Sequence, residues 1–180
     1  TNLDIRYRGT TSQPSMTDLV DVTDDSNPLY ITKGNPELKP SFRNNVRVLF
    51  NTYNADAQRG FNVYASYDNV LNSITRKATY IEETGATITQ PDNINGNWSV
   101  DGGFTFNSAI PANTKFTYVT NTNARYANNV SYISMRGYTG SEKNTARTLT
   151  LMERLSGNYR TDNFDVSLNG FIQYSHSSTT

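Results

Sequence analysis

The sequence predicts an all-β fold, built as an up-and-down antiparallel meander of about seven long strands. Aromatic residues make up 12% of the chain, including 12 Tyr and 8 Phe, and such side chains suit a half-buried pleated surface. Apolar and polar residues alternate over stretches much longer than the usual strand of about 5–6 residues. Most of the turns between these stretches are short, so consecutive strands are expected to pair.

In the first third of the chain, the sequence pattern predicts two strands separated by a long connection. Residues 2–8 alternate, with Leu3, Ile5 and Tyr7 on one side. Residues 10–40 hold four of the six prolines and are predicted to be a loop, with one helical turn at 15–19. Residues 42–53 alternate again and predict the second strand.

The rest of the chain predicts five further strands with the same alternation. A third strand, at 61–82, and a fourth, at 87–107, meet in a hairpin at 83–85, and Pro91 and Gly96 are expected to bend the fourth. Glu153 falls on the apolar side of the sixth predicted strand, at 144–159. A bulge, or a polar group on a neighbouring strand, would accommodate it. The remaining elements are strands at 114–127, 144–159 and 164–174, turns at 54–60, 108–113 and 160–163, and a long loop at 128–141.

The two faces of these strands indicate a membrane environment. In the second, fourth and seventh strands the apolar face carries no charge and has aromatic residues near its ends: Trp98, Phe106, Phe164 and Tyr174. The opposite face is rich in Asn, Ser, Thr and Asp, which suits a water-filled lumen. The mean hydropathy of −0.65 fits alternating strands, and no apolar run reaches the about 18 residues of a membrane helix. The meander is therefore predicted to be part of a large outer-membrane β-barrel.

Composition argues against several other classes of protein. The formal net charge is zero, so no nucleic-acid partner is expected. The chain has no cysteine and His176 is its one histidine, which gives little support for a zinc site or a nucleophile–base pair. The acidic run from Asp18 to Asp25 has oxygen ligands but not the spacing of a calcium loop, and is interpreted as solvated charge. We expect no metal, no cofactor and no enzymatic activity.

The segment Gly34-Asn35-Pro36-Glu37-Leu38-Lys39-Pro40 stands out because it is stiff. Gly34 can take a positive φ without penalty, and the two prolines fix φ near −65°. The residues before each proline are pushed toward extended geometry. This segment is interpreted as a rigid loop that leads into the second strand rather than as a ligand contact.

The order of these features resembles the barrel region of TonB-dependent receptors, and of the outer-membrane β-barrel family common in Bacteroides-like bacteria. The resemblance rests on Tyr7-Arg8-Gly9-Thr10-Thr11-Ser12-Gln13-Pro14-Ser15 followed by Leu19, and on the segment from Gly34 to Pro40. That family usually continues with Glu after the last proline, where this chain has Ser41. The resemblance implies a barrel of about 22 strands, a plug domain and a periplasmic energy-coupling protein, with outer-membrane lipid around it.

The function expected from these features is nutrient uptake across the bacterial outer membrane, for a glycan, a siderophore or a similar ligand. Residues 1–180 are expected to be a single barrel segment without the plug, cut from a longer protein. Loop residues that stack on or pair with ligands are predicted to be Tyr126, Tyr132, Arg136 and Tyr138; Gly34, Asn35, Pro36, Leu38, Lys39 and Pro40 are predicted to be structural. The alternative is a soluble all-β binding or adhesion module whose apolar face packs on a second sheet.

Overall fold

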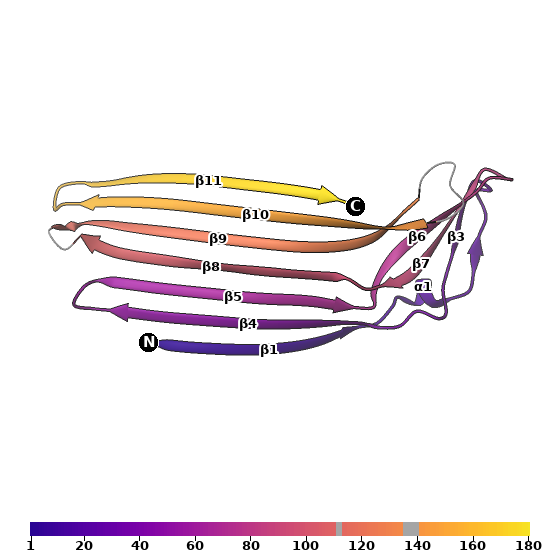
Figure 1. The fold of residues 1–180 in the computed structure, drawn as a ribbon, viewed down its shortest axis with the longest axis horizontal. Coiled ribbons are helices and arrows are strands. Elements are labelled where there is room, and N and C mark those ends of the chain that lie inside the picture. Colours follow the sequence, from indigo (N-terminus) through magenta and orange to yellow (C-terminus); the bar gives the residue numbers. More distant parts are fainter. Residues whose placement is uncertain (111–112, 135–140) are drawn as a thin grey trace.

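The computed structural model describes residues 1–110, 113–134 and 141–180, and most of them lie in β-strands. Seven long strands form one sheet, called the wall, and run side by side (Figure 1). They are β1 (Asn2–Ser12), β4 (Ser41–Asn54), β5 (Arg59–Leu71), β8 (Asn97–Ile110), β9 (Asn113–Ser134), β10 (Ser141–Arg160) and β11 (Asp165–Thr179). A second, four-stranded sheet, called the rim sheet, contains β2 (Thr23–Asp24), β3 (Tyr30–Lys33), β6 (Ser73–Ile81) and β7 (Ala86–Ile94).

The wall confirms the predicted antiparallel meander. Its strand order is β1-β4-β5-β8-β9-β10-β11, which is the order of these strands along the chain. Every neighbouring pair in it is antiparallel. The connections at one end of the wall are short, whereas the rim sheet lies beyond the other end (Figure 1). This layout matches barrels with short turns at one membrane surface and longer loops at the other.

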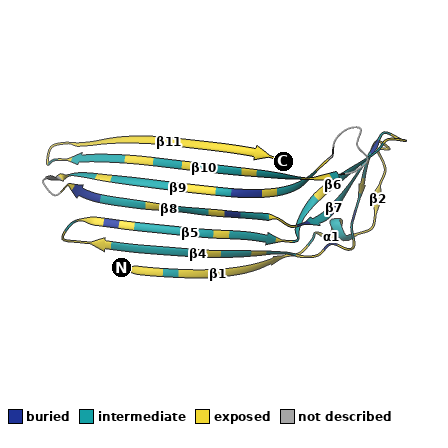
Figure 2. Ribbon diagram, in the orientation of Figure 1, coloured by how far each residue is buried: buried dark blue, intermediate teal, exposed yellow. Residues whose placement is uncertain are grey.

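The registers give the wall one apolar and one polar face. Ile5, Val48 and Ala65 lie opposite one another on three neighbouring strands, and the next row is Arg6, Arg47 and Ser66. Side chains of the apolar face are left uncovered, with Leu168 79% and Ile172 73% exposed. Strands β1 and β11, at the two edges, are exposed along most of their length (Figure 2). A soluble protein rarely leaves so large an apolar surface to water.

Aromatic pairs border the apolar face at two heights. Near the rim sheet, the ring centroids of Trp98 and Tyr126 are 5.5 Å apart; near the short turns, Phe106 and Tyr118 are 5.8 Å apart. Along β8, Trp98 and Phe106 are separated by about 27 Å at about 3.4 Å a residue, or about 21 Å along a barrel axis for a strand tilted by about 40°. The apolar band of an outer-membrane barrel is about 25 Å tall. The aromatic rows are therefore spaced as interfacial girdles would be.

Glu153 is accommodated by the neighbouring strand, one of the two possibilities that its position suggested. Its carboxylate accepts hydrogen bonds from the hydroxyl groups of Thr120, at 2.5 Å, and Thr122. The register of β10 against β9 continues unbroken past it, so no bulge is needed. Two hydrogen-bond donors on the same face reduce the free-energy cost of placing a carboxylate there.

The rim sheet corrects the expectation that every strand pair would be antiparallel and sequential. Its order is β2-β3-β7-β6, and β3 pairs with β7 in parallel. The predicted strands 61–82 and 87–107 are each divided between the two sheets. The first divides at Asn72, with φ of 51°, and the second at Gly96, with φ of 117°. Left-handed residues interrupt an extended chain, and Asn and Gly tolerate that region best.

The two long loops are more regular than predicted. Range 10–40 contains β2, β3 and the expected helical turn, α1 (Met16–Leu19), which Ser15 caps by accepting from the Asp18 amide. Of range 128–141, the structure describes residues 128–134 and 141, and these are strand, because β9 and β10 pair as far as Ser134 opposite Ser141. Within the described residues, no helix is long and apolar enough to cross a membrane.

Candidate functional site

The segment from Gly34 to Pro40 is bonded to both α1 and β7. The Asn35 amide donates to the Asp18 carbonyl at 2.6 Å, and the Asn35 side chain donates to the Pro91 carbonyl at 3.0 Å. In return, the side chain of Gln90 donates to the Gly34 carbonyl at 2.9 Å. The segment therefore holds the rim sheet against the start of β4.

Gly34 is required here by a close backbone contact and not by its φ. It does not adopt a positive φ; among the described glycines only Gly85 and Gly96 do. Instead, a Cβ at this position would lie 1.9 Å from the backbone oxygen of Val20. Only glycine allows the two backbone segments to approach this closely.

Asn93 joins the end of this segment to the bend between β5 and β6. Its Oδ1 accepts from the Lys39 amide at 2.7 Å, and its Nδ2 donates to the carbonyls of Lys39, at 3.0 Å, and Asn72, at 2.9 Å. Leu38, the residue before Lys39, is only 7% exposed. One side chain thus fixes the backbone on both sides of the place where the wall meets the rim sheet.

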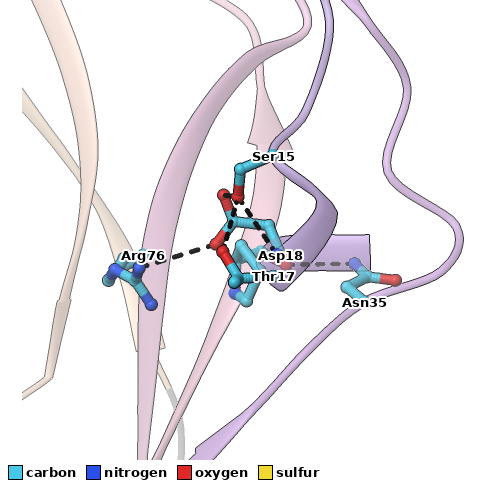
Figure 3. A network of polar contacts seen from close by, with 6 residues as sticks. Ser15, Thr17, Asp18, Asn35 and Arg76 are labelled. Atoms are coloured by element: carbon cyan, nitrogen blue, oxygen red, sulfur yellow. Dashed lines mark hydrogen bonds and ion pairs between the residues drawn. The ribbon is translucent and has the colours of Figure 1, made fainter. Parts of the chain in front are cut away.

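Asp18 links α1 to β6 (Figure 3). Its carboxylate accepts from the Ser15 hydroxyl at 2.6 Å and lies 3.5 Å from a guanidinium nitrogen of Arg76. Ser15 and Thr17 also share a hydrogen bond of 2.9 Å. Farther along this connection, hydrogen bonds from the side chain and amide of Ser26 lower the pKa of Asp24.

A polar hollow of about 460 Å³ opens beside the same segment. Cations, carboxylates and amides line it; Lys33, Lys77, Glu37, Asp21, Asp92, Asn35 and Gln90 are among them. Tyr132 adjoins the hollow from the end of β9 that extends past its pairing with β8. The Lys77 ammonium lies 5.4 Å from the Tyr132 ring centre, and the Tyr132 hydroxyl donates to Asp92 at 3.3 Å. Burial and the neighbouring Asp92 carboxylate raise the pKa of Tyr132.

Tyr126 and Tyr132, the two predicted ligand residues that the structure describes, are not brought together. Tyr126 lies on the apolar face of the wall against Trp98, whereas Tyr132 lies beside the rim sheet. Arg136 and Tyr138 fall outside the described residues. The neighbours of Tyr132 were missed because they belong to β6 and β7, which were expected to continue the wall. The polar run from Thr89 to Asn93 was the available signal, since it interrupts the apolar alternation.

The groups around this hollow are suited to binding polar solutes. No cluster of three or more His, Cys, Asp or Glu suited to a metal ion occurs among the described residues. An aromatic ring, a cation, carboxylates and amides around an open hollow are groups that bind polar solutes by hydrogen bonds and ring contacts.

A one-sided sheet of long antiparallel strands with aromatic borders defines a segment of an outer-membrane β-barrel wall. The chain belongs to the outer membrane protein beta-barrel family, whose sequence model matches residues 1–180. No match was found among curated proteins or among solved structures. The family places the protein in the bacterial outer membrane and decides against the soluble module that was the alternative.

Proposed function

We propose that this chain is a wall segment of a TonB-dependent receptor that imports a nutrient, such as a glycan or a siderophore. The observation that carries the proposal is the bonding of the segment from Gly34 to Pro40 into the rim sheet. A loop region fixed in this way offers a preformed surface at the end of the wall where ligands arrive, and preformed surfaces lose less entropy on binding.

In the proposed mechanism the rim sheet captures the ligand and the polar face of the wall conducts it inward. Tyr132 supplies an aromatic surface, while Lys77 and Asp92 supply charged hydrogen-bonding groups beside it. The apolar face meets lipid. The remaining barrel strands would pair with the free edges of β1 and β11, a plug would fill the lumen, and a periplasmic energy-coupling protein would drive transport.

The test is substrate uptake by the native bacterium. A strain lacking the complete gene should fail to grow on one glycan or iron–siderophore source, and a strain lacking the energy-coupling protein should show the same defect. In the purified receptor, Tyr132→Ala should weaken binding of that nutrient about tenfold, because an aromatic contact is lost.

Tyr53→Ala is the matched control, since Tyr53 is 62% exposed at the opposite end of the wall. Its affinity for the nutrient should equal that of the unmodified receptor. Normal growth of the gene-deletion strain on every source, or uptake that persists without the energy-coupling protein, would contradict the proposal.

A further inference from the structure

A second hollow, of about 600 Å³, opens on the polar face of the wall close to the rim sheet. It is formed by β1, β4 and β5, and its lining includes Arg8, Thr10, Ser12, Arg43, Asn45 and Asp68. These residues come from neighbouring positions in the strand registers, so rigid paired strands hold them in place. The hollow is separate from the one beside Tyr132, with which it shares no lining residue.

Cations outnumber carboxylates around this hollow. On the polar face of β1, β4 and β5 the charged side chains are four arginines and two aspartates: Arg6, Arg8, Arg43, Arg47, Asp4 and Asp68. Arg6 and Arg47 lie directly opposite each other in the register, an arrangement that destabilises strand pairing. Asp4 offsets part of this repulsion, but the surplus of positive charge on this face does not help to hold the sheet together.

Both aspartates are already engaged by neighbouring side chains. Asp4 accepts from Arg6 at 2.9 Å. The two oxygens of Asp68 accept from Arg43, at 2.8 Å, and from the Asn45 amide, at 3.1 Å. Among the ion pairs of the described residues, none includes Arg8 or Arg47. Arg8 therefore presents an exposed guanidinium to the hollow, beside the hydroxyl groups of Thr10 and Ser12.

We propose that this hollow binds the carboxylate or phosphate group of a small anionic solute inside the barrel, with Arg8 as its main ligand. A guanidinium donates two parallel hydrogen bonds to either group. Asp68 acts as a positioning residue, because it holds Arg43 and Asn45 at the side of the hollow. A lumen with low-dielectric walls strengthens the field of such a cluster. The inference deepens the proposed function by naming an anionic class of solute.

The test is calorimetric titration of the complete detergent-solubilised protein with citrate and with inorganic phosphate, at constant ionic strength. Saturable binding of at least one probe is expected, and Arg8→Gln should weaken it about tenfold or more, because charge-assisted bonds are lost. Arg125→Gln is the matched control: Arg125 lies on the same polar face but on β9, and its removal should leave the affinity unchanged. Binding of citrate alone assigns a carboxylate, and binding of phosphate alone assigns a phosphate group.

A second measurement needs no variant. Phenylglyoxal should modify Arg8 in the unmodified protein, and whichever probe binds should protect Arg8 but not Arg125, as mapped by mass spectrometry. Binding of neither probe, equal losses in the two variants, or an Arg8 that is unreactive without any anion would overturn the proposal. The last result would mean that another part of the protein covers the hollow. All of these measurements use purified protein, whereas the proposed uptake is tested in cells. A negative result here would therefore contradict the anion site without contradicting the proposed uptake.

Discussion

At the scale of single residues, the rim sheet depends on close backbone approaches and on side-chain amides. Gly34 lies against the backbone of Val20. Asn35 bonds to a backbone group of β7, and Asn93 bonds to backbone groups of Lys39 and Asn72. Backbone groups in a connection have no strand partner, so side chains of this kind satisfy them instead. The short Asn side chain, which carries both a donor and an acceptor, suits this role.

Substitution of Gly34 by Ala should loosen the rim sheet. The added Cβ would lie 1.9 Å from the Val20 carbonyl oxygen, and this backbone atom cannot rotate away as a side chain can. Overpacking of this kind costs about 1–3 kcal/mol. Exchange of the Asn35 amide hydrogen, measured by mass spectrometry, should accelerate roughly 5- to 150-fold. The reason is that this loss of local stability makes the opening that exposes the amide more frequent.

Gly170→Ala provides the comparison for this substitution. A Cβ at Gly170 meets no atom within 4 Å, so exchange throughout the protein should be unchanged. Equal effects of the two substitutions would show that the backbone contact at Gly34 does not hold the rim sheet.

At the scale of elements, the connection between the wall and the rim sheet is the unusual part of the fold. The hairpin of β6 and β7 continues β5 and β8 but leaves their sheet, and the parallel pairing of β3 with β7 ties the 10–40 connection to it. Asn93 fastens this junction by bonding to Lys39 and Asn72. Asn93 therefore fixes the place where the chain passes from the wall to the rim sheet, and contacts such as that of Lys77 with Tyr132 join the two sheets elsewhere.

Asn93→Ala should expose the segment from Gly34 to Pro40 to proteolysis. The substitution removes three hydrogen bonds, and each is worth about 0.5–1.5 kcal/mol. Cleavage between Glu37 and Leu38 by a glutamate-specific protease should become at least about tenfold faster, because this backbone must detach to enter the protease. The wall strands should stay intact on the same gel.

Asn129→Ala serves as the control, since Asn129 is exposed and no side-chain hydrogen bond of the described residues includes it. If the protease cuts both variants at the unmodified rate, Asn93 does not fasten the junction.

The sequence predicted the wall well and the rim sheet poorly, for a physical reason. In β11 the alternation of Val166, Leu168 and Ile172 with polar residues reflects a strand with two different faces, and any short stretch of the sequence reveals it. The break at Asn72 is held by two hydrogen bonds with residues that are distant in sequence: the Asn93 side chain donates to the Asn72 carbonyl, and the Asn72 amide donates to the Asn95 side chain. The contacts of Tyr132 and the hollow near Arg8 likewise arise from pairing of remote segments, which periodicity does not encode.

At the scale of the whole molecule, the two faces of the wall are suited to a boundary between lipid and water. Its apolar face carries aromatic borders, and its polar face carries arginines, aspartates and amides. Neighbouring residues along a strand point to opposite faces, so a single strand should experience both environments in alternation. Membership of the outer membrane protein beta-barrel family agrees with this arrangement.

The most direct test of this account measures that alternation in a bilayer. The chain contains no cysteine, so Phe104→Cys and Thr105→Cys can each carry one spin label within it, and Leu151→Cys and Thr150→Cys repeat the test on β10. Labels at positions 104 and 151 should collide mainly with oxygen, which concentrates in lipid, and labels at 105 and 150 mainly with a water-soluble nickel chelate. Labels at 104 and 151 that are shielded from both reagents, as in a two-sheet core, or that favour the nickel chelate would contradict the account.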